Sequence, residues 1–139
     1  MNINERRKAL KPPKTYSGLT LSTQPIKDID KGIEVNLDGY IDTYNSSFFQ
    51  KYAMSLIEEG NLHFIFNCTS LNYLSSTGIG LFTVLINVLR PKDGSVVLVN
   101  LQPKVNDIFK ILGLLSFFTV FDSVEEAKLF LDATIEKKI

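Results

Sequence analysis

Residues 63–90, HFIFNCTSLNYLSSTGIGLFTVLINVLR, decide the fold that this sequence predicts. The first six residues form a near-continuous apolar run, which is typical of a strand buried on both faces of a sheet. From Ile79 onward, apolar residues recur at helical spacing until Arg90-Pro91 ends the helix. Three adjacent hydroxyl residues, Ser75, Ser76 and Thr77, lie where the strand gives way to the helix.

Strand and helix patterns alternate on both sides of this stretch. Alternation of this kind favours parallel strands joined by right-handed crossovers. The sequence therefore predicts an α/β fold with a mostly parallel mixed sheet of about five strands and about four helices. The strands are expected at 19–23, 32–37, 63–68, 95–100 and 117–121, and the helices at 43–60, 78–89, 102–114 and 123–138. Asp38-Gly39 is expected to end the second strand, and Ser123 with Glu126 matches a capping box for the last helix.

The composition argues against a nucleic-acid-binding, membrane-spanning or metal-binding protein. A chain of 139 residues predicts one domain, and its net charge of zero gives no reason to expect nucleic acid or a membrane as a partner. The one cysteine and one histidine favour neither a metal site nor a disulfide, and no cofactor is expected. No apolar run reaches the roughly 18 residues of a membrane span, and no signal peptide is recognised. These features predict a cytoplasmic protein.

The first 16 residues differ in character from the rest. They hold five basic residues against one acidic residue, a net charge of +4, and Pro12-Pro13 argues against a continuous helix. We expect residues 1–16 to form a flexible basic tail and residues 17–139 to form the domain. The tail is either a solvated terminus or an arm that contacts an acidic partner or lipid.

Two loops are expected to lie side by side at the carboxyl edge of the sheet, where functional loops of parallel α/β sheets gather. They are residues 37–42, LDGYID, and residues 72–78, NYLSSTG. A serine nucleophile would need a base within hydrogen-bond reach, but His63 is expected at the opposite end of its strand. A third glycine for a phosphate-binding fingerprint is missing, because that position is Thr83. Gly78 and Gly80 are therefore interpreted as allowing close approach of the helix to the sheet, and Cys68 as a small core residue.

The hydroxyl run then suggests a substrate of phosphorylation rather than a catalyst. One hydroxyl is enough to cap a helix, yet three are present. A phosphoryl group at a helix N-terminus is tolerated by the fold, because it meets free backbone N–H groups and the positive end of the helix dipole. It would still add about −1.5 to −2 charge to the surface and oppose a docked partner.

The sequence FNCTSLNYLSSTGIGLFTVL, residues 66–85, resembles the signature of STAS-domain anti-sigma-factor antagonists. In that family a loop of the form aromatic–apolar–Asp–Ser–Ser/Thr–Gly–apolar–Gly opens a helix. Residues 37–54 resemble the Gly-x-x-Asp loop and first helix of the family, and residues 94–131 resemble its final strand–helix–strand–helix run. The resemblance covers about residues 17–135 and implies a STAS fold.

The resemblance implies a bacterial regulator that is not an enzyme. An unphosphorylated antagonist binds an anti-sigma factor that is also a serine kinase, which releases a sigma factor, and phosphorylation by the kinase ends the complex. A phosphatase resets the system. Carried over by position, Ser76 is the phosphorylated residue, with Thr77 as the alternative. The partner-binding residues implied by the resemblance are Gly39, Asp42, Ser75, Ser76, Thr77 and Gly78.

One position departs from the family pattern, because Ser75 stands where the family most often has Asp. Two other functions therefore stay open. One is a STAS interaction or scaffold module without phosphorylation, and the other is a small nucleotide-binding protein.

Overall fold

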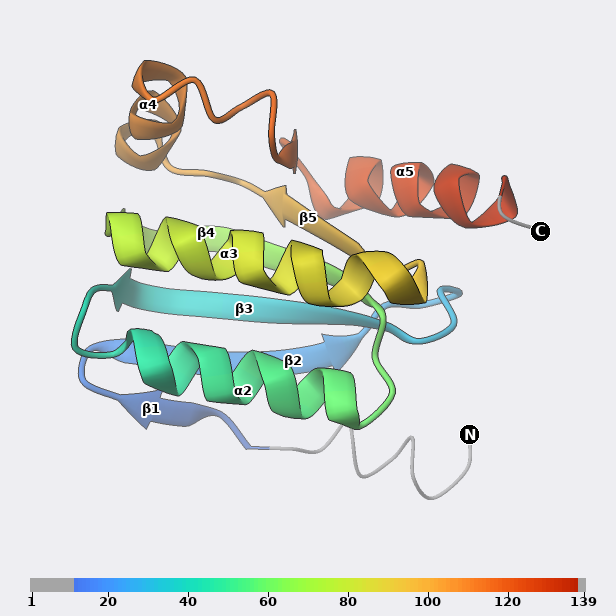
Figure 1. Ribbon diagram of the computed structural model, residues 1–139, viewed down its shortest axis with the longest axis horizontal. Helices are drawn as coiled ribbons and strands as arrows, with labels where there is room; N and C mark the ends of the chain where they lie inside the picture. Colours follow the sequence, from blue (N-terminus) through green and yellow to red (C-terminus); the bar gives the residue numbers. More distant parts are fainter. Residues whose placement is uncertain (1–11, 138–139) are drawn as a thin grey trace.

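The computed structural model describes residues 12–137, which form a six-stranded sheet (Figure 1). The spatial order of the strands is their order along the chain. Strand β2 pairs antiparallel with both β1 and β3, and the strands from β3 to β6 are parallel. The strands are β1 Lys14–Tyr16, β2 Leu19–Pro25, β3 Gly32–Ile41, β4 His63–Leu74, β5 Ser95–Val99 and β6 Thr119–Phe121.

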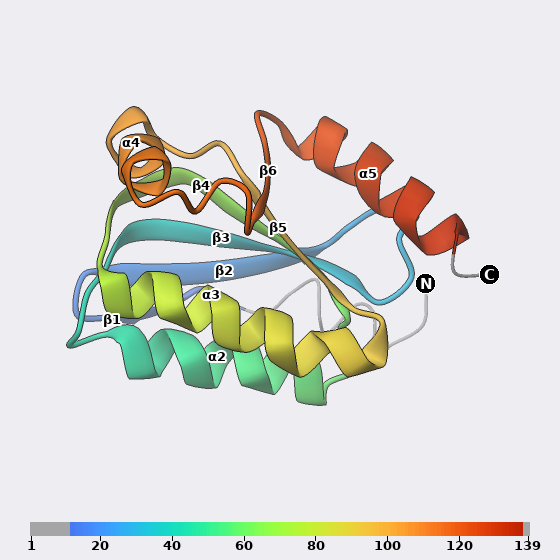
Figure 2. The same ribbon diagram turned by 45° about the horizontal axis from the view of Figure 1, so that its top comes forward.

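The helices cover both faces of the sheet. Helices α2 and α3 lie side by side on one face, and α5 lies over the other (Figures 1 and 2). The helices are α2 Ser46–Glu58, α3 Ser76–Leu89, the short 3-10 helix η1 Arg90–Lys92, α4 Pro103–Ile111 and α5 Val124–Glu136. The expected α/β class and mostly parallel mixed sheet are thus confirmed, with one strand more than predicted.

Strand β4 is the centre of the core, as its apolar run predicted. Phe66 packs edge-on against Phe82 of α3 and Phe49 of α2, with ring centroids 5.1 and 5.7 Å away. On the other face Ile65 packs with Ala127 and Leu131 of α5. Burial on both faces explains why this strand lacks the alternation of a half-exposed strand.

Both strands that lead to the predicted loops are longer than expected. The prediction that Asp38-Gly39 ends β3 is wrong, because the strand continues to Ile41 through two register shifts against β4. Gly39 has φ +117°, so the turn-like dipeptide produces an irregularity within the strand. Strand β4 likewise extends to Leu74, so residues 72–74 of the expected second loop are strand.

The N-terminal boundary differs in part from the predicted tail. Lys14–Tyr16 form β1, which pairs with β2 through three residue pairs although all three residues are exposed. Residues 1–11 lie outside the described residues, so the flexible tail and the domain boundary at residue 17 stay predictions.

Helix ends follow the expected signals. Helix α3 ends at Leu89, before Pro91. Helix α5 begins after Ser123, whose hydroxyl accepts a hydrogen bond from the Glu126 backbone N–H at 3.1 Å.

Candidate functional site

Strands β3 and β4 end side by side, so the two predicted loops meet at one edge of the sheet. Ile41 and Leu74 are register partners, and the Ser75 backbone N–H donates to the Ile41 carbonyl at 2.9 Å. Figure 1 shows the loop between β3 and α2 next to the start of α3, at the left of the view. The hydroxyl run therefore lies directly beside the loop that contains Asp42.

Ser75 is the N-cap of α3. Its backbone is extended, and its side-chain oxygen accepts a hydrogen bond from the Gly78 N–H at 3.1 Å. Asp and Ser are both strongly preferred at this position, because each offers an oxygen to the unpaired N–H groups of the first turn. Ser75 therefore caps the helix as an Asp would, without the negative charge of a carboxylate.

Substitution of Ser75 tests this cap. We expect Ser75→Ala to lower the free energy of unfolding by about 1 kcal/mol, because the Gly78 N–H loses its acceptor. Ser75→Asp should stay within about 0.5 kcal/mol of the wild type, since the carboxylate caps equally well. Urea unfolding measures both, and equal stability of all three proteins would contradict the capping role.

Ser76 and Thr77 are the first two residues of α3, and both are exposed. Within residues 12–137 their side-chain hydroxyls have no hydrogen-bond partner. Because Ser75 already provides the cap, a group added to Ser76 removes no interaction that holds the helix. The positive end of the helix dipole lies next to that hydroxyl.

Gly78 sets the distance between α3 and the sheet. It is buried, and a Cβ at this position would lie 2.5 Å from Leu74 Cδ1 and 2.8 Å from Ile41 Cγ2. Gly80 is different, because a Cβ there would have no atom within 4 Å. The interpretation of close approach therefore holds for Gly78 alone. Its burial gives it a packing role, and partner contact at Gly78 stays a prediction.

Asp42 and Asn45 hold each other in a reciprocal hydrogen-bonded loop. Asp42 Oδ1 accepts from the backbone N–H groups of Tyr44 at 2.8 Å and Asn45 at 3.0 Å. Asn45 Oδ1 accepts from the Asp42 N–H at 2.9 Å. The loop is thus fixed in shape before any partner arrives.

Asn45 was missed by the sequence analysis, although it is fully buried and central to the site. Its amide nitrogen donates to the carbonyls of Tyr40 at 2.8 Å and Ser17 at 3.0 Å. It therefore ties the Asp42 loop both to the end of β3 and to the turn between β1 and β2. The available signal was the Asp42-x-x-Asn45 spacing, since such side chains bond nearby backbone groups.

Gly39 is required by the backbone of the same region. Its φ of +117° is rarely adopted by other residues, and a Cβ would lie 1.9 Å from the Gly18 carbonyl oxygen. That oxygen accepts the Tyr40 N–H at 3.2 Å, so it is held in place. The structure thus gives Gly39 a conformational role, and its part in partner binding stays a prediction.

The histidine that could serve as a catalytic base lies at the opposite end of β4 from this edge. His63 begins β4, twelve residues long, and its Nδ1 lies 3.1 Å from Ser95 Oγ, whereas Ser76 follows the other end of the strand. Within residues 12–137 no group of three or more His, Cys, Asp or Glu side chains is arranged to hold a metal ion. The hydroxyl run therefore has no neighbouring histidine to act as a base.

Cys68 is a buried core residue, 1% exposed. Burial raises the pKa of its thiol from an ordinary value of 9.0 to about 12. The unfolded thiol releases its proton first, so stability should fall as the pH rises from about 9 to 12. At pH 8 we expect a thiol reagent to label Cys68 only as fast as the protein unfolds, and rapid labelling of the folded protein would contradict this.

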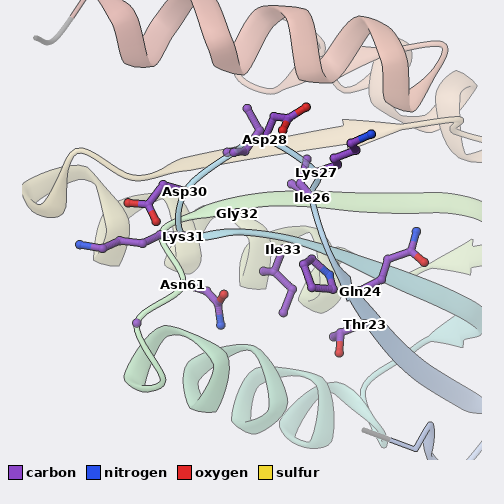
Figure 3. Close-up of a pocket in the computed structure, with 13 residues that line it drawn as sticks. Thr23, Gln24, Ile26, Lys27, Asp28, Asp30, Lys31, Gly32, Ile33 and Asn61 are labelled. Carbon is purple, nitrogen blue, oxygen red and sulfur yellow. The ribbon is translucent and has the colours of Figure 1, made fainter. Parts of the chain in front are cut away.

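A cavity of about 770 Å³ lies at the other end of the sheet (Figure 3). The end of β2, the loop between β2 and β3, the start of β3, and Gly60 and Asn61 after α2 line it. Figure 3 shows Asp30 and Lys31 extending to one side and Lys27 to the other, so these charges do not converge on one point. Nothing at this cavity supports the nucleotide-binding alternative.

Comparison with known proteins gives a family. The model of the STAS domain matches residues 24–127. BtrV of Bordetella bronchiseptica, named as a candidate anti-sigma factor antagonist, is 29% identical over 99 residues, which cover 71% of this chain and 85% of BtrV. The anti-sigma-B factor antagonist of Staphylococcus aureus is 25% identical over 96 residues, 69% of this chain and 89% of the relative.

Solved structures share the fold. The anti-sigma factor antagonist SpoIIAA in its unphosphorylated form has a TM-score of 0.64 and 23% identity, over 78% of this chain and 93% of its own. The phosphorylated form of SpoIIAA, from Bacillus, has a TM-score of 0.58 and 22% identity, over 78% and 96% of the two chains. Among the helices of residues 12–137, none combines the length and apolar character needed to cross a membrane.

Proposed function

The chain belongs to the STAS domain family, and on that premise we propose that it is an anti-sigma factor antagonist that works by partner switching. In its unphosphorylated form it binds an anti-sigma factor with serine kinase activity, and a sigma factor is released. Phosphorylation of Ser76 by that kinase ends the complex, and a phosphatase restores the binding form. The names of the relatives BtrV and the Staphylococcus aureus antagonist support this proposal.

One observation carries the proposal: Ser76 is exposed in the first turn of α3, while its neighbour Ser75 caps the helix. A phosphoryl group on Ser76 leaves the cap intact and lies near the positive end of the helix dipole. The fold therefore accepts the modification. A partner docked on this edge would have to bury about −1.5 to −2 units of added charge, which is costly.

The proposal implies no catalytic activity and a cytoplasmic location. The expected partners are proteins, with no direct contact to nucleic acid or membrane. Asp42 and the residues from Ser75 to Gly78 are proposed to frame the docking surface, because their two loops are joined by the bond from the Ser75 N–H to the Ile41 carbonyl.

Phosphotransfer to a mapped residue tests the proposal. Each anti-sigma factor kinase of the source organism is purified and incubated with the protein and ATP, and the modified residue is located by mass spectrometry. We expect modification of Ser76 by one of these kinases and its loss in Ser76→Ala, while Thr77→Ala is still modified. The assignment of Ser76 would be contradicted if the Ser76→Ala variant were still modified, at Thr77 alone. It would also be contradicted if no kinase modified any residue of the wild type.

The scaffold alternative has one observation in its favour. Ser75 lacks the negative charge that the family most often places beside the acceptor serine. A kinase that binds the protein but transfers no phosphate would favour the scaffold function over the switch, and a Ser75→Asp variant then tests whether the missing charge is the reason. Recovery of phosphotransfer by that variant would mean that the chain functions as an unphosphorylated interaction module.

A further inference from the structure

Tyrosine is concentrated at the edge that contains Ser76. The chain has five tyrosines, and four of them are exposed large side chains close to this edge. Their exposed fractions are 53% for Tyr16, 36% for Tyr40, 83% for Tyr44 and 50% for Tyr73. We call these four residues the tyrosine surface.

The strand register brings three of the tyrosines to this edge, and Tyr44 follows in the loop between β3 and α2. Tyr40 and Tyr73 are partners at the ends of β3 and β4. Tyr16 is the last residue of β1, next to the turn that leads into β2. Three strand spacings of about 4.8 Å separate β1 from β4, so the surface is roughly 15 Å wide. That width fits within a standard protein interface of about 800 Å² per partner, roughly 30 Å across.

Two of the tyrosines are held in place before any partner binds. The ring of Tyr16 packs against Phe48 of α2 with centroids 5.6 Å apart. The ring of Tyr40 lies over Gly18, where even a Cβ would be 2.1 Å from it. Ordering side chains costs affinity when a complex forms, so rings that are already fixed bind at lower cost.

The turn between β1 and β2 is physically joined to the Ser76 site. The buried Asn45 side chain donates to the Ser17 carbonyl and accepts from the Asp42 N–H, and the Gly18 carbonyl accepts from the Tyr40 N–H. Strand β1 and this turn lie outside residues 24–127, the part that matches the family model. The hydrogen bonds above therefore bring residues from outside the matched range to the docking edge.

Most exposed residues between the tyrosines carry hydroxyl or amide groups, namely Ser17, Thr43, Asn72, Ser76 and Thr77, and Asp38 and Asp42 add two carboxylates nearby. The carboxylate of Asp42 is directed at two backbone N–H groups of its own loop. Enrichment in tyrosine is typical of the buried centre of protein interfaces.

We propose that the tyrosine surface is the main binding contact for the anti-sigma factor, and that Tyr16 on the hairpin of β1 and β2 contributes to the choice of partner. This proposal rests on the proposed function. The partner face it fits has apolar pockets for the rings and acceptors for the phenolic hydroxyls. Its contact with Ser76 lies inside the same tyrosine-rich area, where a partner would have to bury the charge of a phosphoryl group, which is costly.

Titration calorimetry with the kinase that phosphorylates the wild type tests the proposal. We expect Tyr16→Ala and Tyr73→Ala each to raise the Kd at least about tenfold. Tyr16→Phe should stay within about threefold, since it keeps the ring and its packing on Phe48. Thermal unfolding of each variant shows that the fold is intact.

Phe130→Ala is the matched control. Phe130 is 36% exposed and packs against Phe121 at 5.4 Å, much as Tyr16 packs against Phe48, but it belongs to α5 on the other face of the sheet. We expect this variant to bind the kinase like the wild type. Equal weakening by Phe130→Ala and Tyr16→Ala would overturn the proposal, because the effect would then not be local.

The outcomes separate this proposal from the proposed function. If Ser76→Asp abolishes binding but Tyr16→Ala and Tyr73→Ala bind like the wild type, the tyrosine surface is not the contact and the switch stands. If no kinase binds the wild type, the proposed function is contradicted. The proposal for the tyrosine surface then fails with it, because the anti-sigma factor is the partner that it names. If the wild type is a dimer that Tyr16→Ala dissociates, the surface joins two copies of the chain, and the proposal is overturned.

Discussion

Ser76→Asp weakens binding to the anti-sigma factor kinase by at least about 100-fold, or about 2.8 kcal/mol, if the switch operates as proposed. The expected cause is the burial of an added carboxylate in a contact area that is rich in tyrosines, hydroxyls and amides. The fold should be unaffected or slightly stabilised, because an acidic residue in the first turn of α3 suits the helix dipole. Titration calorimetry gives the affinity, and thermal unfolding gives the stability.

Ser76→Asn is the matched control, since Asn has the shape of Asp without its charge. We expect Ser76→Asn to lose no more than about tenfold in affinity and Ser76→Ala to bind like the wild type. If Asn weakens binding as much as Asp, steric exclusion rather than charge ends the complex. Binding of Ser76→Asp at wild-type affinity would contradict the switch altogether.

Gly39→Ala should lower the free energy of unfolding by about 3 to 5 kcal/mol, the largest effect on stability that we expect from one methyl group. Two costs add at this position: a φ of +117° and a Cβ only 1.9 Å from the Gly18 carbonyl oxygen. The clash is with backbone that also accepts the Tyr40 N–H, so it cannot be relieved by turning a side chain. Urea unfolding of the purified variant measures the change.

Gly80→Ala is the counterpart within the neighbouring helix. A Cβ at Gly80 meets no atom within 4 Å, and alanine favours the helix, so stability should rise by up to about 1 kcal/mol. A Gly39→Ala protein within about 1 kcal/mol of the wild type would mean that the turn between β1 and β2 shifts easily. The tie between that turn and the Asp42 loop would then be weaker than the hydrogen bonds of Asn45 indicate.

The central part of the fold was predictable because its signals are strong and local. The apolar run in β4 and the helical spacing of α3 each specify one element, and Pro91 marks an end. Alternation of strands and helices then implied that two loops meet at the carboxyl edge, and the bond between the Ser75 N–H and the Ile41 carbonyl confirms that they do. The exposure of Ser76 also agrees with the expectation from its place at a helix start.

The missed features depend on contacts between distant residues. Strand β1 is fully exposed and three residues long, so it has no apolar pattern and is defined only by pairing with β2. Asp38-Gly39 looks like a turn, but the neighbouring strand β4 keeps β3 extended to Ile41. The Asp42-x-x-Asn45 spacing indicates the local bonds of Asn45, but no local pattern reveals its bond to Ser17, 28 residues earlier in the chain.

The most direct test compares the two states of one protein. The wild type is prepared unphosphorylated and singly phosphorylated on Ser76, and each form is titrated against the kinase and unfolded thermally. The account predicts a Kd at least about 100-fold higher for the phosphorylated form, with Tm values within about 2 °C. Equal affinities, or a phosphorylated form that has lost its folded structure, would contradict it.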